Sequence, residues 1–321
     1  MAGTHKRSRP DAVTPNLSLA AVVDFPSRYL DKLKEHDVRH GSSLLPQLLR
    51  NTCAQEVLVT SSYSGIGGAE TAASMLSAHI SSTDQAAPAR IRMYSACERK
   101  KTATAVLQQH PAMTDAHIFG DILDRLPKHV QQQCLEIQSA RISEWKELKR
   151  LGEGTAAKRD ELGQLLFSQL SGILDAVEFE QEAFCAKHGI KCSVNVRAAL
   201  PLDTESFIHV EAAGSTCLAW TSFGKSAGWL HESTLPCLVW CYSTRYFEPD
   251  CIIHENGPHF DEKPLAHILR GERRRGRRGP HSRNVLGIGG RPVANYILHC
   301  EIFCPTDLVC HQGANGNIRF S

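Results

Sequence analysis

The sequence lacks a long apolar segment. No uninterrupted apolar run approaches the roughly 20 residues that a membrane-spanning helix needs. The first ten residues, Met1 to Pro10, are basic and contain no apolar core of the kind found in secretory signals. We therefore expect a protein without a membrane span that works inside the cell. The hydrophobic content of 42% and charged content of 22% exclude a disordered or fibrous chain.

The sequence also lacks paired C-x2-C hooks, although 12 cysteines are many for an intracellular protein. Two C-x3-C pairs exist, Cys237/Cys241 and Cys300/Cys304, and both lie in apolar runs. Cysteine in such runs behaves as a small buried hydrophobic residue, and disulfides are rare in a reducing compartment. The sequence therefore predicts structural cysteines and no metal site, with zinc at one of these pairs as the less favoured alternative.

Little net charge is present, +2 over 321 residues, but the positive charge is local. Between Arg270 and Arg291 there are eight arginines and one acid, Glu272. Such a stretch suits salt-sensitive contacts with phosphates, and a solvated flexible loop is the equal alternative. Its dense part consists of Arg270, Arg273, Arg274, Arg275, Arg277 and Arg278. The basic run at residues 6–9 is either a nuclear import signal or part of a solvated tail.

Apolar, β-branched segments alternate with helical ones from about residue 55. This alternation predicts a mostly parallel, doubly wound α/β sheet of Rossmann-like type. Strands are expected at 55–63, 91–96, 117–119, 207–211, 251–254 and 295–303, with a helix at 70–80. Residues 1–50 are interpreted as a basic tail with a helix at about 27–35, and 51–321 as one catalytic domain.

Residues from about 123 to 190 interrupt the alternation. They are rich in Gln, Glu, Lys, Leu and Ala with apolar residues at helical spacing, for example over 130–151 and 158–184. We interpret them as two or three helices inserted into the α/β domain, forming a packing arm or lid and not an independent active module.

A glycine cluster, Tyr63-Ser64-Gly65-Ile66-Gly67-Gly68, lies between the first strand and its helix. Such a turn lets the backbone approach a ligand, although glycine there can also serve turn geometry alone. Glu98 and Asp121-Ile122 follow the next two strands, where an acid can accept ribose hydroxyls or an exocyclic amine. A dinucleotide motif would require glycine at position 70, which is Glu70 here. An acid there suits a positively charged ligand, which favours S-adenosyl-L-methionine.

These segments together resemble the cytosine-C5 DNA methyltransferase family. Residues 63–68 resemble its first motif, an aromatic-S-G-x-G-G, and Glu98 and Asp121 fall where the family has its second and third motif acids. Gly214-Ser-Thr-Cys217-Leu-Ala-Trp-Thr-Ser-Phe-Gly224 is similar to the fourth motif, G-x-P-C-Q-x-F-S-x-x-G, and Glu255-Asn256-Gly257 to the sixth, E-N-V. The order and spacing of the motifs are more specific than any one of them, and the resemblance covers about 55–122 and 205–308.

The resemblance implies a covalent mechanism. A thiolate at Cys217 would add to C6 of cytosine, and Glu255, with Asn256 beside it, would hydrogen-bond the base, so that C5 can attack the methyl donor. The target base would have to be flipped out of the duplex. The chain departs from the motifs at Thr216, Leu218, Trp220-Thr221 and Gly257.

We therefore expect a nuclear DNA (cytosine-5-)-methyltransferase that uses S-adenosyl-L-methionine. Two alternatives are methylation of tRNA cytosine and an inactive remnant that binds nucleic acid or a protein partner. After Cys304-Pro-Thr-Asp-Leu308 the sequence shows neither the family's Q-x-R-x-R motif nor a target-recognition region. We expect on this basis an incomplete catalytic domain.

Overall fold

The computed structural model describes residues 25–41, 43, 46, 55–83, 90–200, 207–221, 226–257 and 259–270. The chain divides into two units, one of Met1–Leu45 with Glu301–Ser321 and the other of Pro46–Cys300. The first unit contains helix α2 (Phe25–His40), which confirms the predicted N-terminal helix and extends it at both ends. The arginines beyond Arg270 and the predicted strand 295–303 lie outside the described residues.

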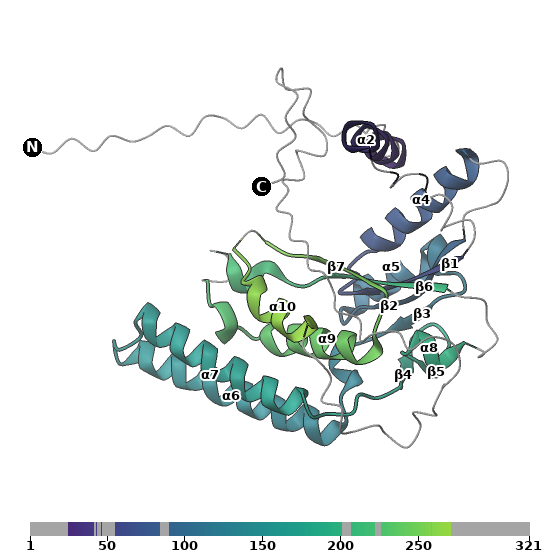
Figure 1. The fold of residues 1–321 in the computed structure, drawn as a ribbon. Helices are drawn as coiled ribbons and strands as arrows, with labels where there is room; N and C mark the ends of the chain where they lie inside the picture. The colour runs from purple at the N-terminus through teal and green to yellow at the C-terminus, as the bar shows by residue number, and fades with distance from the viewer. Residues whose placement is uncertain are drawn as a thin grey trace, which may run out of the picture. The chain divides into compact units, whose positions relative to one another are not determined.

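The second unit contains a seven-stranded sheet in the order β5-β4-β3-β2-β1-β6-β7 (Figure 1). Its strands are β1 (Glu56–Ser62), β2 (Ile91–Cys97), β3 (His117–Phe119), β4 (Glu182–Cys185), β5 (Ile190–Ser193), β6 (Phe207–Gly214) and β7 (Cys251–Glu255). Strands β3, β2, β1, β6 and β7 are parallel, whereas β4 and β5 run antiparallel at one edge. The prediction of an α/β fold with a mostly parallel sheet is confirmed, and the sheet is compatible with a Rossmann-like fold.

The order of the parallel strands reverses between β1 and β6. The chain proceeds from β1 outward through β2 and β3, and then returns to the other side of β1 to form β6 and β7. In open α/β sheets this reversal opens a crevice beyond the carboxyl ends of the two strands, and ligands bind there. The site is therefore expected after Ser62 and Gly214, the last residues of β1 and β6.

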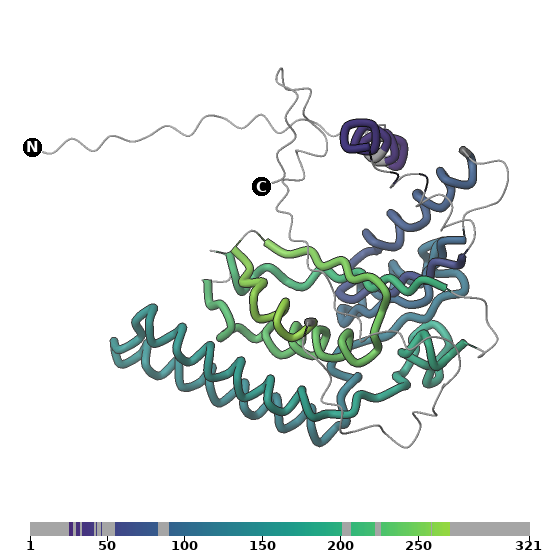
Figure 2. Tube along the Cα trace, viewed as in Figure 1, coloured from purple at the N-terminus to yellow at the C-terminus, as the bar shows by residue number. Residues whose placement is uncertain are grey.

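Helices cover both faces of the sheet, as Figures 1 and 2 show. Two neighbouring residues of β1 illustrate this, because successive side chains of a strand point to opposite faces. The hydroxyl of Ser61 contacts Glu70 on α4, whereas the hydroxyl of Ser62 donates to Glu211, which also binds Trp240 on α9. Burial on both sides explains why six of the seven residues of β1 are buried.

The helices of the second unit are α4 (Gly68–Thr83), α5 (Lys101–Gln109), α6 (Lys128–Arg150), α7 (Ala156–Leu174), α8 (Val196–Ala199), α9 (Thr234–Phe247) and α10 (Glu262–Arg270). Short 3-10 turns are η1 (Pro111–Met113), η2 (Ile122–Arg125), η3 (Cys217–Trp220) and η5 (Gly228–Leu230). Within the described part of the chain, no helix is both long enough and apolar enough to cross a membrane.

The insertion is only partly helical. Helices α6 and α7 confirm its predicted start, and every fourth residue of α7 is buried, namely Leu162, Leu166, Leu170 and Leu174. The predicted helix over 158–184 is wrong beyond Leu174, because the burial pattern then changes to a period of two. Ala183 and Cys185 are buried while Glu182 and Phe184 are exposed, and a turn leads into β5.

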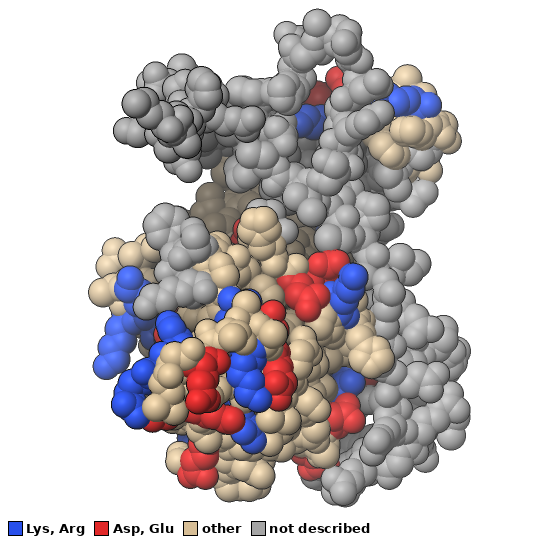
Figure 3. Space-filling view, turned by 90° about the vertical axis from the view of Figure 1, so that its left-hand side faces the viewer, with Lys and Arg blue, Asp and Glu red and all other residues tan. Residues whose placement is uncertain are grey.

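Charges of both signs alternate where α6 and α7 meet. Figure 3 views the molecule from the side of this helical pair, and blue and red side chains are interspersed there. Several are paired on the same helix, such as Arg150 with Glu147 and Lys158 with Glu161. The described residues of this helical pair therefore offer a solvated, mixed surface and not a basic patch for a polyanion.

Candidate active site

The predicted site residues follow the carboxyl ends of five adjacent parallel strands. The glycine cluster follows β1, Glu98 follows β2, and Asp121 lies two residues after β3. On the other side of the reversal, Cys217 comes three residues after β6 and Glu255 is the last residue of β7. Because parallel strands end at one edge of a sheet, the structure brings all five groups to the same edge.

The turn after β1 has a backbone shape that requires glycine. Gly65 and Gly67 have φ angles of 57° and 100°, and a Cβ added at Gly67 would lie 3.0 Å from Cδ2 of His110. Tyr63 also has a positive φ, 59°, an uncommon conformation for an aromatic residue that is typical of strained functional turns. Its hydroxyl is buried without a hydrogen-bond partner among the described residues, and this burial raises the pKa of Tyr63 well above its usual value.

The two predicted acids hold backbone groups of the site. Glu98 accepts hydrogen bonds from the backbone N–H of Gly65, at 2.9 Å, and of Lys100, at 2.7 Å. Each carboxylate oxygen has a second lone pair, so Glu98 can fix the turn and still accept from a ligand hydroxyl. Asp121 caps η2 by accepting from the N–H of Leu123 at 3.0 Å.

Two predicted cofactor residues, Ile122 and Ile66, and the acid Glu70 lie in different surroundings. Ile122 is 4% exposed and packs in the hydrophobic core, so its side chain lines no open cleft. Ile66 projects from the turn and is 73% exposed. Glu70 is fully buried, with one oxygen bound by Ser61 and the other, Oε2, unpaired among the described residues. The Glu70 carboxyl group lies in the first turn of α4, enclosed by protein.

Cys217 is exposed and begins the 3-10 turn η3. Thr216 precedes it and caps η3, its hydroxyl accepting from the N–H of Leu218 at 3.4 Å. The segment before Cys217 is tied to β7 by Asn256, whose Nδ2 donates to the carbonyl of Ser215 at 3.0 Å and to its hydroxyl at 2.8 Å. Asn256 therefore fixes the position of the segment that presents the thiol.

The Cys217 loop and the end of β7 touch directly. A Cβ added at Gly257 would lie 3.2 Å from the Cβ of Cys217. Gly214 pairs with Glu255 in the sheet, and a Cβ at Gly214 would lie 3.5 Å from Oε2 of Glu255. The thiol of Cys217, in the turn that follows β6, and the carboxyl group of Glu255, at the end of the neighbouring strand β7, thus lie at the same end of the sheet.

Aromatic rings support the loop from behind. Trp220, at the end of η3, packs edge-on against Trp229 with centroids 5.1 Å apart and against Phe260 at 5.3 Å. His254 stacks on Trp240 at 4.7 Å, and its Nε2 lies 2.8 Å from the hydroxyl of Ser215. Trp220 is therefore part of a packed aromatic cluster that limits movement of the loop.

A buried polar network beneath the site was not predicted. Glu211, on β6, is 5% exposed and accepts hydrogen bonds from Ser62 at 2.6 Å, from Nε1 of Trp240 at 2.9 Å, and from Thr60. Arg125 reaches the same network through Ser62 at 3.3 Å. This network links β1 and β6, the strands that precede the glycine turn and the Cys217 loop, to η2 and α9.

One sequence signal could have revealed the network. His209 and Glu211 are two residues apart in a predicted buried strand, so both had to face the same side of the sheet. Buried polar groups must be paired, and a pair of them at strand spacing indicates partners on the covering layer.

Comparison with known proteins assigns this chain to no family. No protein-family model matches the sequence, and no curated protein matches it significantly. The functional conclusion rests on the residues themselves and on their arrangement.

Proposed function

We propose that the protein is an S-adenosyl-L-methionine-dependent cytosine-C5 methyltransferase acting on nucleic acid, with DNA as the expected substrate and the nucleus as its site of action. One observation carries this proposal. The thiol, the carboxyl group, the glycine turn and the two acids required by that chemistry come from five separate segments, yet all follow the same edge of one parallel sheet. The strand reversal between β1 and β6 lies among them.

The glycine turn and its acids fit the methyl donor. Gly65 and Gly67 leave the backbone without side chains where a ligand would approach, and Glu98 and Asp121 supply acceptors for hydroxyl and amine groups. The Glu70 carboxyl group, enclosed in the first turn of α4, favours positive charge above it electrostatically and not by contact. When bound, S-adenosyl-L-methionine supplies an electrophilic methyl group.

The other half of the site supplies the nucleophile. The Cys217 thiolate forms a bond to C6 of the cytosine, and electron density moves onto C5, which then becomes nucleophilic. Glu255 holds N3 and the exocyclic amine through its carboxyl group, which stabilises the charge that this addition creates. Asn256 acts as a positioning residue through Ser215. After methyl transfer, loss of the C5 proton to a base and departure of the thiolate restore the aromatic ring.

A nucleic acid substrate suits the exposure of Cys217. A base inside a duplex cannot reach a thiol at the edge of a sheet, so the target nucleotide must be flipped outward. The arginine run begins at Arg270, the last residue of α10, and continues to Arg278 in the sequence. Its proposed role is sequence-independent contact with phosphates.

A trapping experiment tests the proposal. The full chain is incubated with 5-fluorocytosine-containing DNA or RNA and S-adenosyl-L-methionine, because fluorine at C5 prevents the final elimination. We expect a denaturant-stable adduct that Cys217→Ser abolishes. Cys251→Ser is the matched control, since Cys251 is also exposed but begins β7 at the opposite edge, and it should form the adduct normally.

The outcomes separate the alternatives. An adduct with RNA alone would select methylation of tRNA cytosine. If neither polymer forms an adduct and Cys217→Ser behaves as the wild type, the chain is an inactive remnant that binds nucleic acid or a protein partner. An adduct that persists in Cys217→Ser would overturn the assigned nucleophile.

A further inference from the structure

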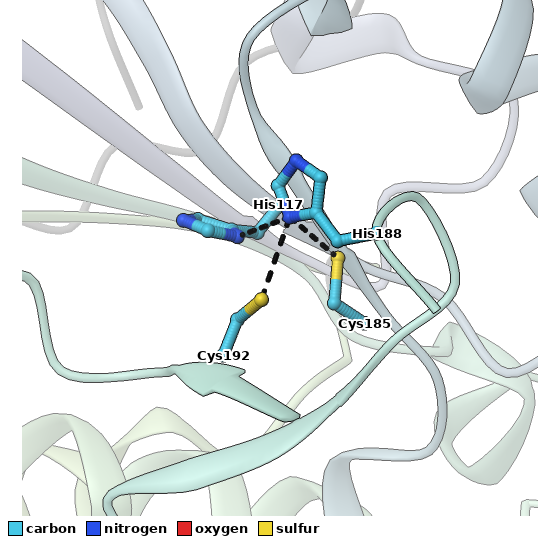
Figure 4. Close-up of side chains that lie close together, drawn as sticks. All are labelled: His117, Cys185, His188 and Cys192. Carbon is cyan, nitrogen blue, oxygen red and sulfur yellow. Dashed lines mark hydrogen bonds between the residues drawn. The ribbon is translucent and has the colours of Figure 1, made fainter. Parts of the chain in front are cut away.

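Four metal-binding side chains converge at the edge of the sheet formed by β3, β4 and β5. They are His117, Cys185, His188 and Cys192 (Figure 4). His117 begins β3, Cys185 ends β4, His188 lies in the following turn, and Cys192 belongs to β5. His117 lies at the amino end of β3, whereas Asp121 follows its carboxyl end. The cluster and the proposed active site are therefore distinct.

The hairpin explains how residues distant in sequence meet. Cys192 pairs with Ala183, two residues before Cys185, so both cysteines lie on one face of the hairpin. The turn closes with a hydrogen bond from the N–H of Gly189 to the carbonyl of Cys185 at 2.9 Å, and Gly189 adopts a φ of 71°. His188 is thereby returned toward the two sulfur atoms.

The distances within the cluster match a tetrahedral metal shell. Nδ1 of His188 lies 3.1 Å from Nδ1 of His117, 3.5 Å from Sγ of Cys185 and 3.4 Å from Sγ of Cys192. Ligands on one zinc ion at 2.0–2.3 Å are separated by about 3.3 Å between two nitrogens and about 3.6 Å between nitrogen and sulfur. All four donor atoms lie within 4.8 Å of one another, so the shell closes with shifts of about 1 Å or less.

Hydrogen bonding alone accounts poorly for this arrangement. One imidazole nitrogen either donates a single hydrogen or accepts through a single lone pair. Nδ1 of His188 nevertheless has three potential partners, two of them sulfur atoms. A cation at the centre of the four atoms gives every donor a partner at once.

The donor set selects the kind of metal. Two thiolates and two imidazoles in tetrahedral array are typical of zinc, and they neutralise its double charge. The backbone N–H of Ile118 donates to Sγ of Cys185 at 3.3 Å, which is the outer-shell support that metal thiolates receive. The C-x2-H spacing of Cys185 and His188 also lies within the range of structural zinc ligands. All four positions are filled by protein, which excludes a vacant catalytic position.

We propose that His117, Cys185, His188 and Cys192 form a structural zinc site that fastens the β4–β5 hairpin to β3. The hairpin needs such a fastening, because its strands have four residues each and two of its large apolar side chains point to solvent. Phe184 is 60% exposed and Ile190 is 63% exposed. β4 pairs with β3 at one residue pair, Phe119 with Cys185, so a metal cross-link would strengthen the attachment of the hairpin to the sheet.

Metal analysis of the full chain tests this site. The protein is produced in zinc-supplemented medium, washed with a chelator, and assayed for metal by mass spectrometry and for visible absorption after cobalt replacement. We expect about one zinc per chain and the intense bands of tetrahedral cobalt bound by thiolates. His188→Ala should weaken zinc binding at least tenfold while the circular dichroism of the domain is retained, because His188 is exposed. The double variant Cys185→Ser, Cys192→Ser should bind none.

Matched controls replace residues of the same type elsewhere. Cys251→Ser and His259→Ala alter an exposed cysteine and an exposed histidine outside the cluster, and both should keep the full zinc content. The inference would be overturned by wild-type protein without zinc or cobalt bands, by unchanged affinity in His188→Ala, or by a Cys185–Cys192 disulfide in non-reduced peptide maps. None of these measurements depends on methyl transfer.

Discussion

The Cβ of Cys217 occupies the space that a side chain at Gly257 would need, at a separation of 3.2 Å. Cys217 directly follows Thr216, so this contact lies beside two positions at which the chain differs from the methyltransferase motifs that it resembles. The motifs have proline before the cysteine and valine after Glu-Asn, whereas this chain has Thr216 and Gly257. Thr216 caps η3 through its hydroxyl, a bond that proline cannot make, and Gly257 makes room for the resulting loop.

Gly257→Val should consequently displace the thiol. A branched side chain at this position must push the Cys217 loop outward, and a misplacement of about 1 Å can lower a reaction rate about a hundredfold. We expect adduct formation with 5-fluorocytosine DNA to slow at least tenfold, and Gly257→Ala to have a smaller effect. Single-turnover adduct formation measures both.

The control for this pair is Gly172→Ala on α7, where an added Cβ meets nothing within 4 Å. It should leave the rate unchanged and slightly stabilise the helix. Wild-type rates in Gly257→Val would show that the loop position is not needed for attack.

Glu98→Ala should weaken binding of S-adenosyl-L-methionine. It removes the acceptor for the N–H groups of Gly65 and Lys100 and the one proposed for the ligand hydroxyls. Hydrogen bonds to charged groups contribute about 1.5–3 kcal/mol, so we expect the dissociation constant to rise about 10- to 100-fold by calorimetry. Glu136→Ala, an exposed position on α6, serves as the control. Equal affinities in the two variants would contradict the assignment.

The sequence predicted those parts of the fold whose signals are local. The glycine turn, Glu98 and Asp121 each adjoin a short apolar strand, so parallel topology alone brings them to one edge. The position of Cys217 next to Gly257 depends on the register of β6 with β7, which no local pattern specifies.

Other features were not predicted from the sequence, because the residues that form them are distant from one another along the chain. His117 meets Cys185 only because β4 pairs antiparallel to β3, and β4 itself was predicted as helix. Cys185 and His188 form a C-x2-H pair, which differs from the C-x2-C pairs typical of zinc ribbons. Helix α9 carries one of the two predicted pairs of structural cysteines, Cys237 and Cys241, and both are buried as expected. The other pair, Cys300 and Cys304, lies outside the described residues.

Glu211→Ala should destabilise the domain strongly. Its removal leaves the hydroxyl of Ser62 and the indole N–H of Trp240 without their acceptor in the core. Breaking such a buried network costs about 3 kcal/mol, which urea unfolding would measure. Glu211→Gln keeps part of the network and should lose less, and Glu136→Ala on the exposed face of α6 should change stability by less than about 0.5 kcal/mol. A small effect of Glu211→Ala would mean that water replaces the carboxylate.

His254 should make stability depend on pH. Its ring is packed between Trp240 and Phe260, and burial lowers its pKa to about 4. The hydroxyl of Ser215 accepts from Nδ2 of Asn256 and lies 2.8 Å from Nε2 of His254, which ties the ring to the segment next to Cys217.

The direction of this pH dependence follows from the difference in the pKa of His254 between the folded and the unfolded chain. An unfolded histidine has a pKa of about 6.5, so below that pH the unfolded chain takes up a proton that the folded chain refuses. The free energy of unfolding is therefore undiminished by His254 above about pH 6.5, and this residue should lower it progressively, by about 3 kcal/mol in all, as the pH falls to about 4. Other buried histidines such as His209, whose pKa burial also lowers, act in the same sense. Urea unfolding at pH 7.5 and 4.5 should thus be compared between wild type and His254→Gln. This substitution removes only the contribution of His254 to the pH dependence of the free energy of unfolding. Parallel pH profiles for the two proteins would show that His254 accepts a proton in the folded state.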